Sequence, residues 1–229
     1  IWANTSGLLN SQDWNPGTIS FEALLHEIGH AVGLKHPFFD PDNETVATLP
    51  SDLDDTRHTV MSYTYATPAG DKGNEYSFHP TTPMILDIGV IQYLYGANMR
   101  YHSGNDVYAF DETTPYHETI WDGGGIDTLQ FTGSMSNVID LTPGAASFIG
   151  LPVYVQSNGV NLGSAIPNVW IAGGVILENV IAGEGNDVLI GNTISNSLDG
   201  GQGIDFVQVQ SARAQSVLNK SASGFTLTA

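Results

Sequence analysis

The sequence contains no cysteine and only six lysine and arginine residues, against 24 aspartates and glutamates. Without cysteine there is no disulfide framework and no thiolate metal site. The formal net charge of −18 makes nucleic acid and anionic membranes poor partners, because both repel an acidic surface. The excess carboxylates must be solvated or bound to cations, and Ca²⁺ is the usual cation of oxygen-rich loops.

Long apolar runs are lacking too. No stretch approaches the length of a membrane-spanning helix, and no signal peptide opens the chain. The chain starts at Ile1 without Met and stops after the strand-like SGFTLTA, so we expect a processed or truncated piece of a longer protein. A hydrophobic content of 41% is nevertheless enough for a packed core.

The stretch HEIGHAVGLKHP, which begins at His26, carries the strongest chemical signal. Two histidines four residues apart on a helix lie about 40° apart around its axis and roughly 6 Å apart along it, so His26 and His30 can reach one metal. Gly33 can adopt positive φ and end the helix, after which His36 can supply a third nitrogen. Three imidazoles leave a fourth position open, as a catalytic zinc site requires. Glu27 projects toward the rim, where a carboxylate can take a proton from water.

Two helices are expected in the first half of the chain. The first runs from about Ser20 to Val32 with Ser20 as N-cap, and its expected buried stripe is Phe21, Leu24, Leu25, Ile28 and Val32. The second, PMILDIGVIQYLYG, has Pro83 at its first position and Gly96 at its end. Its expected buried residues are Met84, Ile85, Ile88, Ile91, Leu94 and Tyr95. IWAN at the start of the chain is typical of a short strand end, and the composition after Gly96 favours short strands and turns.

A nine-residue repeat lies near the end of the chain, in the turns AGEGNDVLI, GNTISNSLD and GGQGIDFVQ. It matches the G-G-x-G-x-D-x-U-x pattern, in which each repeat forms half a coil of a parallel β-roll; the alternative is that the Gly-Asp steps form hairpin turns. Leu189, Leu198 and Val207 would fill the core of the roll. Turns 18 residues apart can hold Ca²⁺ between them, whereas Asn196 in the middle turn predicts no second ion there. The expected ligands are the carbonyl oxygens of Gly183, Gly185, Gly200 and Gln202 and the carboxylates of Asp187 and Asp205.

With these motifs the chain resembles the serralysin-type metzincins, secreted bacterial zinc metalloproteases with a C-terminal RTX calcium-binding β-roll. The resemblance spans nearly the whole chain and rests on HEIGHAVGLKHP, VMSY, TPMILDIGVIQYLYGAN, WDGGGIDTLQF and ENVIAGEGNDVLIGN. It implies an α+β chain with two domains. Residues 1–99 would be the C-terminal portion of a zinc metallopeptidase catalytic domain, and residues 100–229 a truncated RTX-type β-roll/β-sandwich domain.

The resemblance also implies roles for individual residues. His26, His30 and His36 would bind one catalytic Zn²⁺, with Glu27 as general base. Met61 would form the Met-turn beneath the metal. Tyr63 would be an additional zinc ligand that leaves the metal when substrate binds and then helps to stabilise the oxyanion.

Further structural Ca²⁺ ions follow from the resemblance, held between two loops and a strand. The ligands of one ion would be the carbonyl oxygens of His102 and Gly104 together with Asp106, Asp122, Gly124 and Asp127. A neighbouring ion would be held by Gly125, Asp127, the carbonyl oxygen of Ile176, and Glu178.

The first functional hypothesis is a secreted zinc endopeptidase that hydrolyses peptide bonds through a metal-activated water. Its partners would be a polypeptide substrate and an N-terminal fragment of the same protease. Catalytic domains of this type carry a longer segment before the zinc helix, with an edge strand that pairs with substrate, whereas only 25 residues precede His26. The alternative is therefore a proteolytically inactive, calcium-stabilised β-roll scaffold or cleavage fragment. A third hypothesis is a zinc hydrolase for a smaller substrate such as an amide or lactone.

Overall fold

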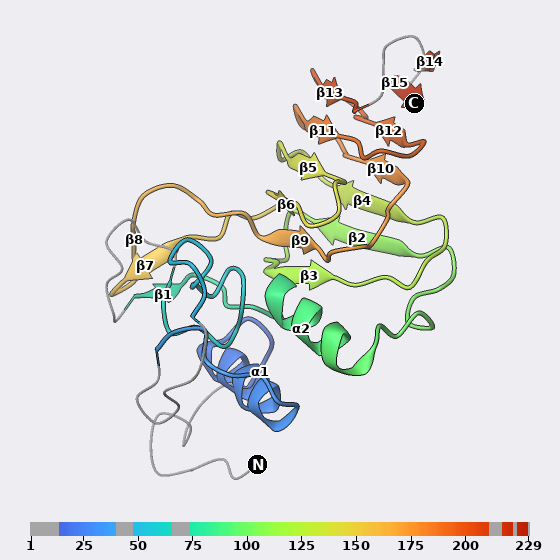
Figure 1. The fold of residues 1–229 in the computed structure, drawn as a ribbon. Coiled ribbons are helices and arrows are strands. Elements are labelled where there is room, and N and C mark those ends of the chain that lie inside the picture. Colours follow the sequence, from blue (N-terminus) through green and yellow to red (C-terminus); the bar gives the residue numbers. More distant parts are fainter. Residues whose placement is uncertain (1–13, 40–47, 66–73, 211–216, 222–223, 229) are drawn as a thin grey trace. The chain divides into compact units, whose positions relative to one another are not determined.

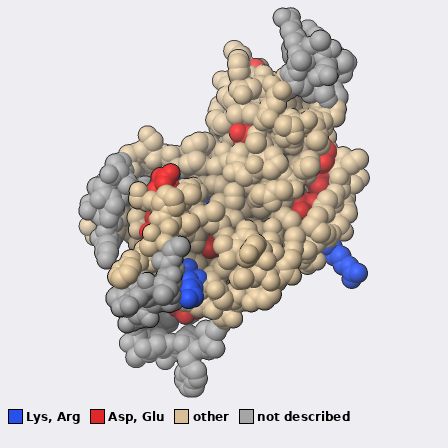
Figure 2. All heavy atoms as spheres, viewed as in Figure 1, with Lys and Arg blue, Asp and Glu red and all other residues tan. Residues whose placement is uncertain are grey.

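The computed structural model describes residues 14–39, 48–65, 74–210, 217–221 and 224–228, so the strand expected at IWAN lies outside the described residues. This described part is mostly β-structure, with two helices and several parallel strand pairs (Figure 1), which agrees in part with the expected α+β class. Neither helix in this described part is long and apolar enough to cross a membrane. Figure 2 shows acidic side chains in several places on one face and few basic ones, in keeping with the net charge.

The chain forms two compact units that are not continuous in sequence. The first contains the residues up to Gly96 together with 116–119 and 153–166, and the second contains 97–115, 120–152 and the residues from 167 onward. The two domains predicted from the sequence, residues 1–99 and 100–229, differ from these units, because they place residues 116–119 and 153–166 in the second domain. The second of these segments groups with the first unit because β1 (Glu75–Tyr76) pairs antiparallel with β7 (Val155–Ser157), which also pairs with β8 (Val160–Asn161).

Helix α1 (Ile19–Ala31) begins before the predicted N-cap. Thr18, not Ser20, caps the helix, because its side-chain oxygen accepts a hydrogen bond from the backbone N–H of Phe21 at 3.3 Å. The predicted end of the helix is confirmed: Gly33 has a φ of +100°, and the N–H of Leu34 donates to the carbonyl oxygen of Gly29 at 2.9 Å.

The apolar stripe predicted for α1 is only partly buried, because Phe21, Leu24, Leu25 and Val32 are half-buried. The fully buried residues of the helix are Ser20, Glu22, His26 and Gly29, whereas Ile28 is 42% exposed. The buried face is the one that contacts the Val60–Met61 segment, since Val60 bonds the His26 ring and Met61 fills the space beside Gly29. These tertiary contacts override the hydrophobic pattern of the helix.

Helix α2 (Ile85–Tyr95) ends at Gly96 as predicted, but Pro83 is not its first residue. Met84 is the N-cap, and its N–H donates to the carboxylate of Asp87 at 2.8 Å. Of the predicted buried stripe only Met84 is fully buried, whereas Leu94 and Tyr95 are 49% and 68% exposed. The charged Asp87 takes the buried position instead, because it binds the loop that precedes Met61.

Two ladders of short parallel strands form the centre of the second unit (Figure 1). One ladder joins β2 (Val107–Asp111), β4 (Thr128–Thr132), β10 (Asn179–Ile181) and β12 (Ser197–Asp199). The other joins β5 (Val138–Asp140), β11 (Val188–Ile190) and β13 (Phe206–Gln208). The hairpin alternative is wrong for these turns, because each strand pairs in parallel with a partner 18 or more residues away.

The remaining strands complete this part of the chain. β6 (Ala146–Ser147) pairs antiparallel with β9 (Val169–Ile171), and β15 (Gly224–Thr228) pairs antiparallel with both β12 and β14 (Val217–Ser221). β3 (Glu118–Ile120) spans the point at which the chain passes from the first unit to the second.

The core of the ladders contains an inward side chain from the middle of each three-residue strand, and β4 contributes both Leu129 and Phe131. Leu129, Val180 and Leu198 are in register in one ladder and are all buried. Ile139 and Leu189 are in register and buried in the other, followed by the half-buried Val207 at its end. The predicted core positions of the repeat are therefore confirmed, with one inward residue per three-residue strand supporting a thin core.

Candidate metal centres

Helix α1 and the turn after it bring three imidazoles together. The Nε2 atoms of His30 and His36 are 3.1 Å apart, and those of His36 and His26 are 3.2 Å apart. One ligand atom from each of the three rings lies within 4.8 Å of the others. The helical spacing of His26 and His30 and the positive φ of Gly33 together produce this convergence, as the sequence pattern predicts.

Backbone carbonyl groups determine which nitrogen of two rings carries hydrogen. His26 Nδ1 lies 2.8 Å from the carbonyl oxygen of Val60, and His30 Nδ1 lies 3.0 Å from that of Leu34. A carbonyl oxygen only accepts, so both Nδ1 atoms donate and both Nε2 atoms carry lone pairs. His36 Nε2 can donate to only one of these two lone pairs. The donor set therefore fits a divalent cation that accepts imidazole nitrogen, as zinc does.

Burial favours the metal-binding form of His26. Loss of solvation lowers the pKa of His26, the Val60 carbonyl opposes this, and the neighbouring His30 and His36 lower the pKa further. A neutral imidazole is the metal-binding form. The ring of His26 is therefore prepared for a metal by its surroundings.

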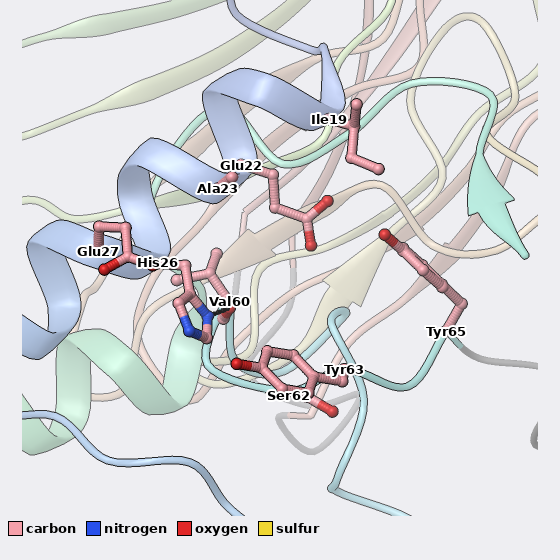
Figure 3. A pocket seen from close by; sticks show the side chains of 9 residues that line it. All are labelled: Ile19, Glu22, Ala23, His26, Glu27, Val60, Ser62, Tyr63 and Tyr65. Carbon is pink, nitrogen blue, oxygen red and sulfur yellow. Dashed lines mark hydrogen bonds between the residues drawn. The ribbon is translucent and has the colours of Figure 1, made fainter. Parts of the chain in front are cut away.

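Glu27 and Tyr63 flank the histidines. Glu27 is exposed on α1 and lines a pocket of about 340 Å³ together with His26, Tyr63 and the side chains at the start of the helix (Figure 3). The Tyr63 hydroxyl lies 2.9 Å from His36 Nε2, and the residue is 58% exposed. A carboxylate and a hydroxyl thus lie at the solvent side of the cluster.

Met61 lies beneath the helix that carries the histidines. It is 1% exposed, and a Cβ atom on Gly29 would lie only 2.5 Å from its sulfur. The contact therefore requires glycine between His26 and His30. The pattern of α1 did not indicate this contact with Gly29, and the Met-turn role of Met61 stays a prediction.

Asp87 is a site residue that sequence reasoning missed. Its carboxylate accepts hydrogen bonds from the Thr59 hydroxyl at 2.5 Å and the Val60 N–H at 2.9 Å. Burial raises the pKa of Asp87, and the hydrogen bonds from Thr59, Val60 and Met84 oppose that rise. Because the carbonyl of Val60 holds the His26 ring, Asp87 positions a candidate ligand through the backbone. The sequence did offer one signal for this role, since Asp87 is the single acidic residue in the mostly apolar helix α2.

A second group consists of carboxylates in the turns before β2 and β4. Asp106, Asp122 and Asp127 offer oxygens within 4.8 Å of one another, and Asp127 is completely buried. Within the described residues, Oδ2 of Asp106 and Oδ2 of Asp127 are buried without a hydrogen-bond partner. Burial raises the pKa of Asp127, and so do Asp122, Glu178 and Asp106, against the Asp106 N–H. Orphaned carboxylate oxygens of this kind fit a hard cation.

The other predicted residues of this group come together in the same turns. The backbone of Gly125 packs so closely on Gly104 that a Cβ would lie 1.6 Å from the Gly104 carbonyl oxygen. The N–H of Asp127 donates to Glu178 at 2.7 Å. His102 has a φ of +46°, and its Nδ1 is 3.4 Å from Asp106. A pocket of about 310 Å³ is lined by several of the predicted ligands, namely Asp122, Gly124, Gly125, Ile176 and Glu178.

The third group lies in the repeat. The N–H of Asp187 donates to Asp205 at 3.0 Å, and the N–H of Gln202 donates to the carbonyl of Gly183 at 3.0 Å. Added Cβ atoms on Gly201 and Gly203 would lie 1.9 Å and 2.0 Å from the carbonyl oxygens of Gly183 and Gly185, and one on Gly200 would lie 2.4 Å from Asp205. The six predicted residues therefore occupy two adjacent, closely packed turns.

Asp187 has one oxygen without a hydrogen bond. It is 1% exposed, and its Oδ2 has no hydrogen-bond partner among the described residues. Burial raises the pKa of Asp187, the backbone and side chain of Asn137 oppose that rise, and Asp205 adds to it. The Oδ2 atom is thus a buried acceptor available to a cation.

Comparison with known proteins identifies the family of the chain. Residues 92–223 match the family described as Peptidase M10 serralysin C terminal. Metalloprotease AprA of Pseudomonas entomophila (strain L48) is 36% identical over 216 residues, which cover 83% of this chain and 41% of that protein. Serralysin of Proteus mirabilis is 36% identical over 193 residues (76% and 36%), and serralysin of Photorhabdus luminescens is 34% identical over 219 residues (86% and 41%).

The chain spans about two fifths of the length of these curated relatives. The family match covers more than half of the chain. It includes the turns that hold the carboxylate groups, while the relatives also align over most of the remaining residues. The chain therefore belongs to the serralysin family of M10 peptidases.

Proposed function

We propose that the protein containing this chain is a secreted zinc endopeptidase that acts on polypeptides. The observation that carries this proposal is the convergence of three imidazole Nε2 atoms beside an exposed carboxylate and a tyrosine hydroxyl. Membership of a peptidase family supports it. His26, His30 and His36 would hold one Zn²⁺, which when bound polarises a substrate carbonyl and makes a water more acidic.

The chain's own residues would move protons and hold the substrate. Glu27 would accept a proton from the attacking water and deliver it to the leaving amine. Tyr63, with more than half of its surface exposed, would donate a hydrogen bond to the oxygen on which negative charge develops. The neighbouring pocket of about 340 Å³ is large enough for a substrate side chain.

We also propose that the carboxylate groups of the second unit bind several structural Ca²⁺ ions. Buried, unpartnered oxygens of Asp106, Asp127 and Asp187 support this proposal. Extracellular calcium modules have dissociation constants of about 10⁻⁴–10⁻³ M, so a calcium-dependent fold suits a protein that finishes folding outside the cell.

The test of the enzymatic proposal is Glu27→Gln in the full-length protein. Peptide cleavage should fall about 10²–10⁴-fold while zinc, measured by metal analysis, stays at one per molecule. Glu75→Gln is the matched control, because Glu75 is exposed on β1 and does not line the pocket. Unchanged cleavage in Glu27→Gln would remove the base from the proposal. Stoichiometric zinc without peptidase activity in the wild type would favour a calcium-stabilised scaffold instead.

A further inference from the structure

Asn137 stands at the position of the repeat aspartates, one coil before Asp187. The strands that follow are in register, Val138 with Val188 and Val188 with Phe206, so residues 137, 187 and 205 form one column. The same backbone hydrogen bond recurs between successive turns: Glu184 N–H donates to Gly133, as Gln202 N–H donates to Gly183. The two pairs of turns are therefore equivalent in backbone structure.

The side chain of Asn137 is buried and completely engaged. It is 1% exposed, and its Nδ2 lies 3.0 Å from the Met135 carbonyl oxygen, 3.3 Å from that of Ala182 and 3.0 Å from Asp187 Oδ1. Its Oδ1 accepts the N–H of Gly150 at 2.9 Å. A donor on one side and three acceptors on the other determine which way the amide points.

The three acceptors are the counterparts of three proposed calcium ligands in the next pair of turns. By register, Met135 corresponds to Gly185, Ala182 to Gly200, and Asp187 to Asp205. The amide nitrogen of Asn137 therefore lies among the oxygens that would surround an ion one coil later.

We infer that the Asn137 side-chain amide is a built-in substitute for a calcium ion. It closes the turn between β5 and β11 without metal, and the row of ions in this column starts only between Asp187 and Asp205. The inference rests on the proposed calcium binding. The amide supplies donors to the oxygens but no charge, so it leaves no buried carboxylate at position 137 to be neutralised.

Asp187 is divided between the two kinds of turn. Its Oδ1 accepts both the backbone N–H of Asn137, at 2.7 Å, and the side-chain amide. Its Oδ2 has no hydrogen bond within the described residues. One oxygen thus serves the metal-free turn and the other remains for the ion. The metal-free turn would then be a preformed template on which the calcium-dependent turn assembles.

The first experiment counts ions in the full-length protein. Calcium titration by calorimetry and metal analysis should show one more Ca²⁺ per molecule in Asn137→Asp than in the wild type. Asn158→Asp is the control, because it adds the same charge at an exposed turn with positive φ, and it should bind as many ions as the wild type. The same number of ions in Asn137→Asp and wild type would overturn the inference.

The second experiment needs no variant and compares hydrogen exchange of calcium-loaded and metal-free wild type. The N–H groups of Asn137 and Val188 bond within the amide-closed turn, and those of Asp187 and Phe206 bond across the calcium turn. Metal removal should accelerate exchange of the second pair at least about tenfold more than that of the first. Equal acceleration of both pairs in a protein that binds calcium would refute only the inference that the Asn137 amide replaces an ion. A wild type that binds no calcium would refute the calcium proposal itself.

Discussion

The histidine cluster and the aspartate turns both converge on space for a cation, but they are assembled from different distances along the chain. Three imidazoles come from one helix and the turn after it. Asp127 and Glu178, in contrast, are 51 residues apart and meet only because their strands are in register. A local site can form with its helix, whereas a distributed site requires the whole coil.

The two regions also differ in how burial affects the metal-binding form of their side chains. In both, burial disfavours the charged form: it lowers the pKa of His26 and raises that of Asp127 and Asp187. For histidine the uncharged form is the one that binds metal, so burial prepares the site. For aspartate the charged form binds metal, so burial of several carboxylates opposes folding until a cation compensates. We therefore expect zinc to occupy a formed site and calcium to complete its fold.

The largest effect should come from removing all metals and returning one at a time. Metal-free protein should lose the part of the strand signal in circular dichroism that comes from the calcium-dependent turns, because uncompensated carboxylates repel one another there, while the turn closed by Asn137 persists. Ca²⁺ alone should restore that signal, and Zn²⁺ alone should not. Full strand signal in the metal-free protein would break the comparison, since the aspartate turns would then be as independent of metal as the histidine cluster.

A smaller effect is expected from filling the space beneath the histidine helix. Gly29→Ala would force a Cβ against the sulfur of Met61 and should lower the free energy of unfolding by about 1–3 kcal/mol, with weaker zinc binding. Gly89→Ala is the matched control on α2, where nothing lies within 4 Å, and it should stabilise by about 0.5–1 kcal/mol. Urea unfolding followed by the helical circular dichroism signal measures both. Similar values for the two variants would contradict the packing of Met61.

An effect of comparable size, limited to one range of pH, concerns a carboxylate that pairs with the guanidinium of Arg57 instead of a metal. Burial acts to raise the pKa of Asp55, but hydrogen bonds from His58 and Arg57 outweigh it and lower the pKa from 3.8 to about 2. The resulting stabilisation, about 2 kcal/mol, is present above pH 3.8 and is lost as the pH falls through about 2.

The free energy of unfolding of Asp55→Asn should accordingly lie about 2 kcal/mol below that of the wild type near neutral pH, and the gap should close in acid. Asp52→Asn, exposed in the same loop, should show no such gap. Denaturant unfolding over a pH series measures it. If the difference in free energy of unfolding does not change with pH, Asp55 stabilises the fold through packing and hydrogen bonds and not through its charge.

Features with a short range in sequence were predictable. Gly33 and Gly96 end their helices as expected, since only a positive φ turns the chain there at low cost. The repeat period correctly indicated which residues, such as Leu189 and Leu198, fill the core of the roll. The predicted helix starts at Ser20 and Pro83 were wrong because Thr18 and Met84, which cap the helices, lie within two residues of them.

The amino-acid sequence by itself determined the chemistry of the ligands and the spacing that brings them together, because helix geometry and strand period act over a few residues. The tertiary structure alone decided which face of each helix is buried, that Asp87 supports His26 through Val60, and that the amide of Asn137 bonds Asp187. Such contacts join residues 27 to 50 positions apart. Their energy depends on the exclusion of water by neighbouring chain segments, which no local pattern records.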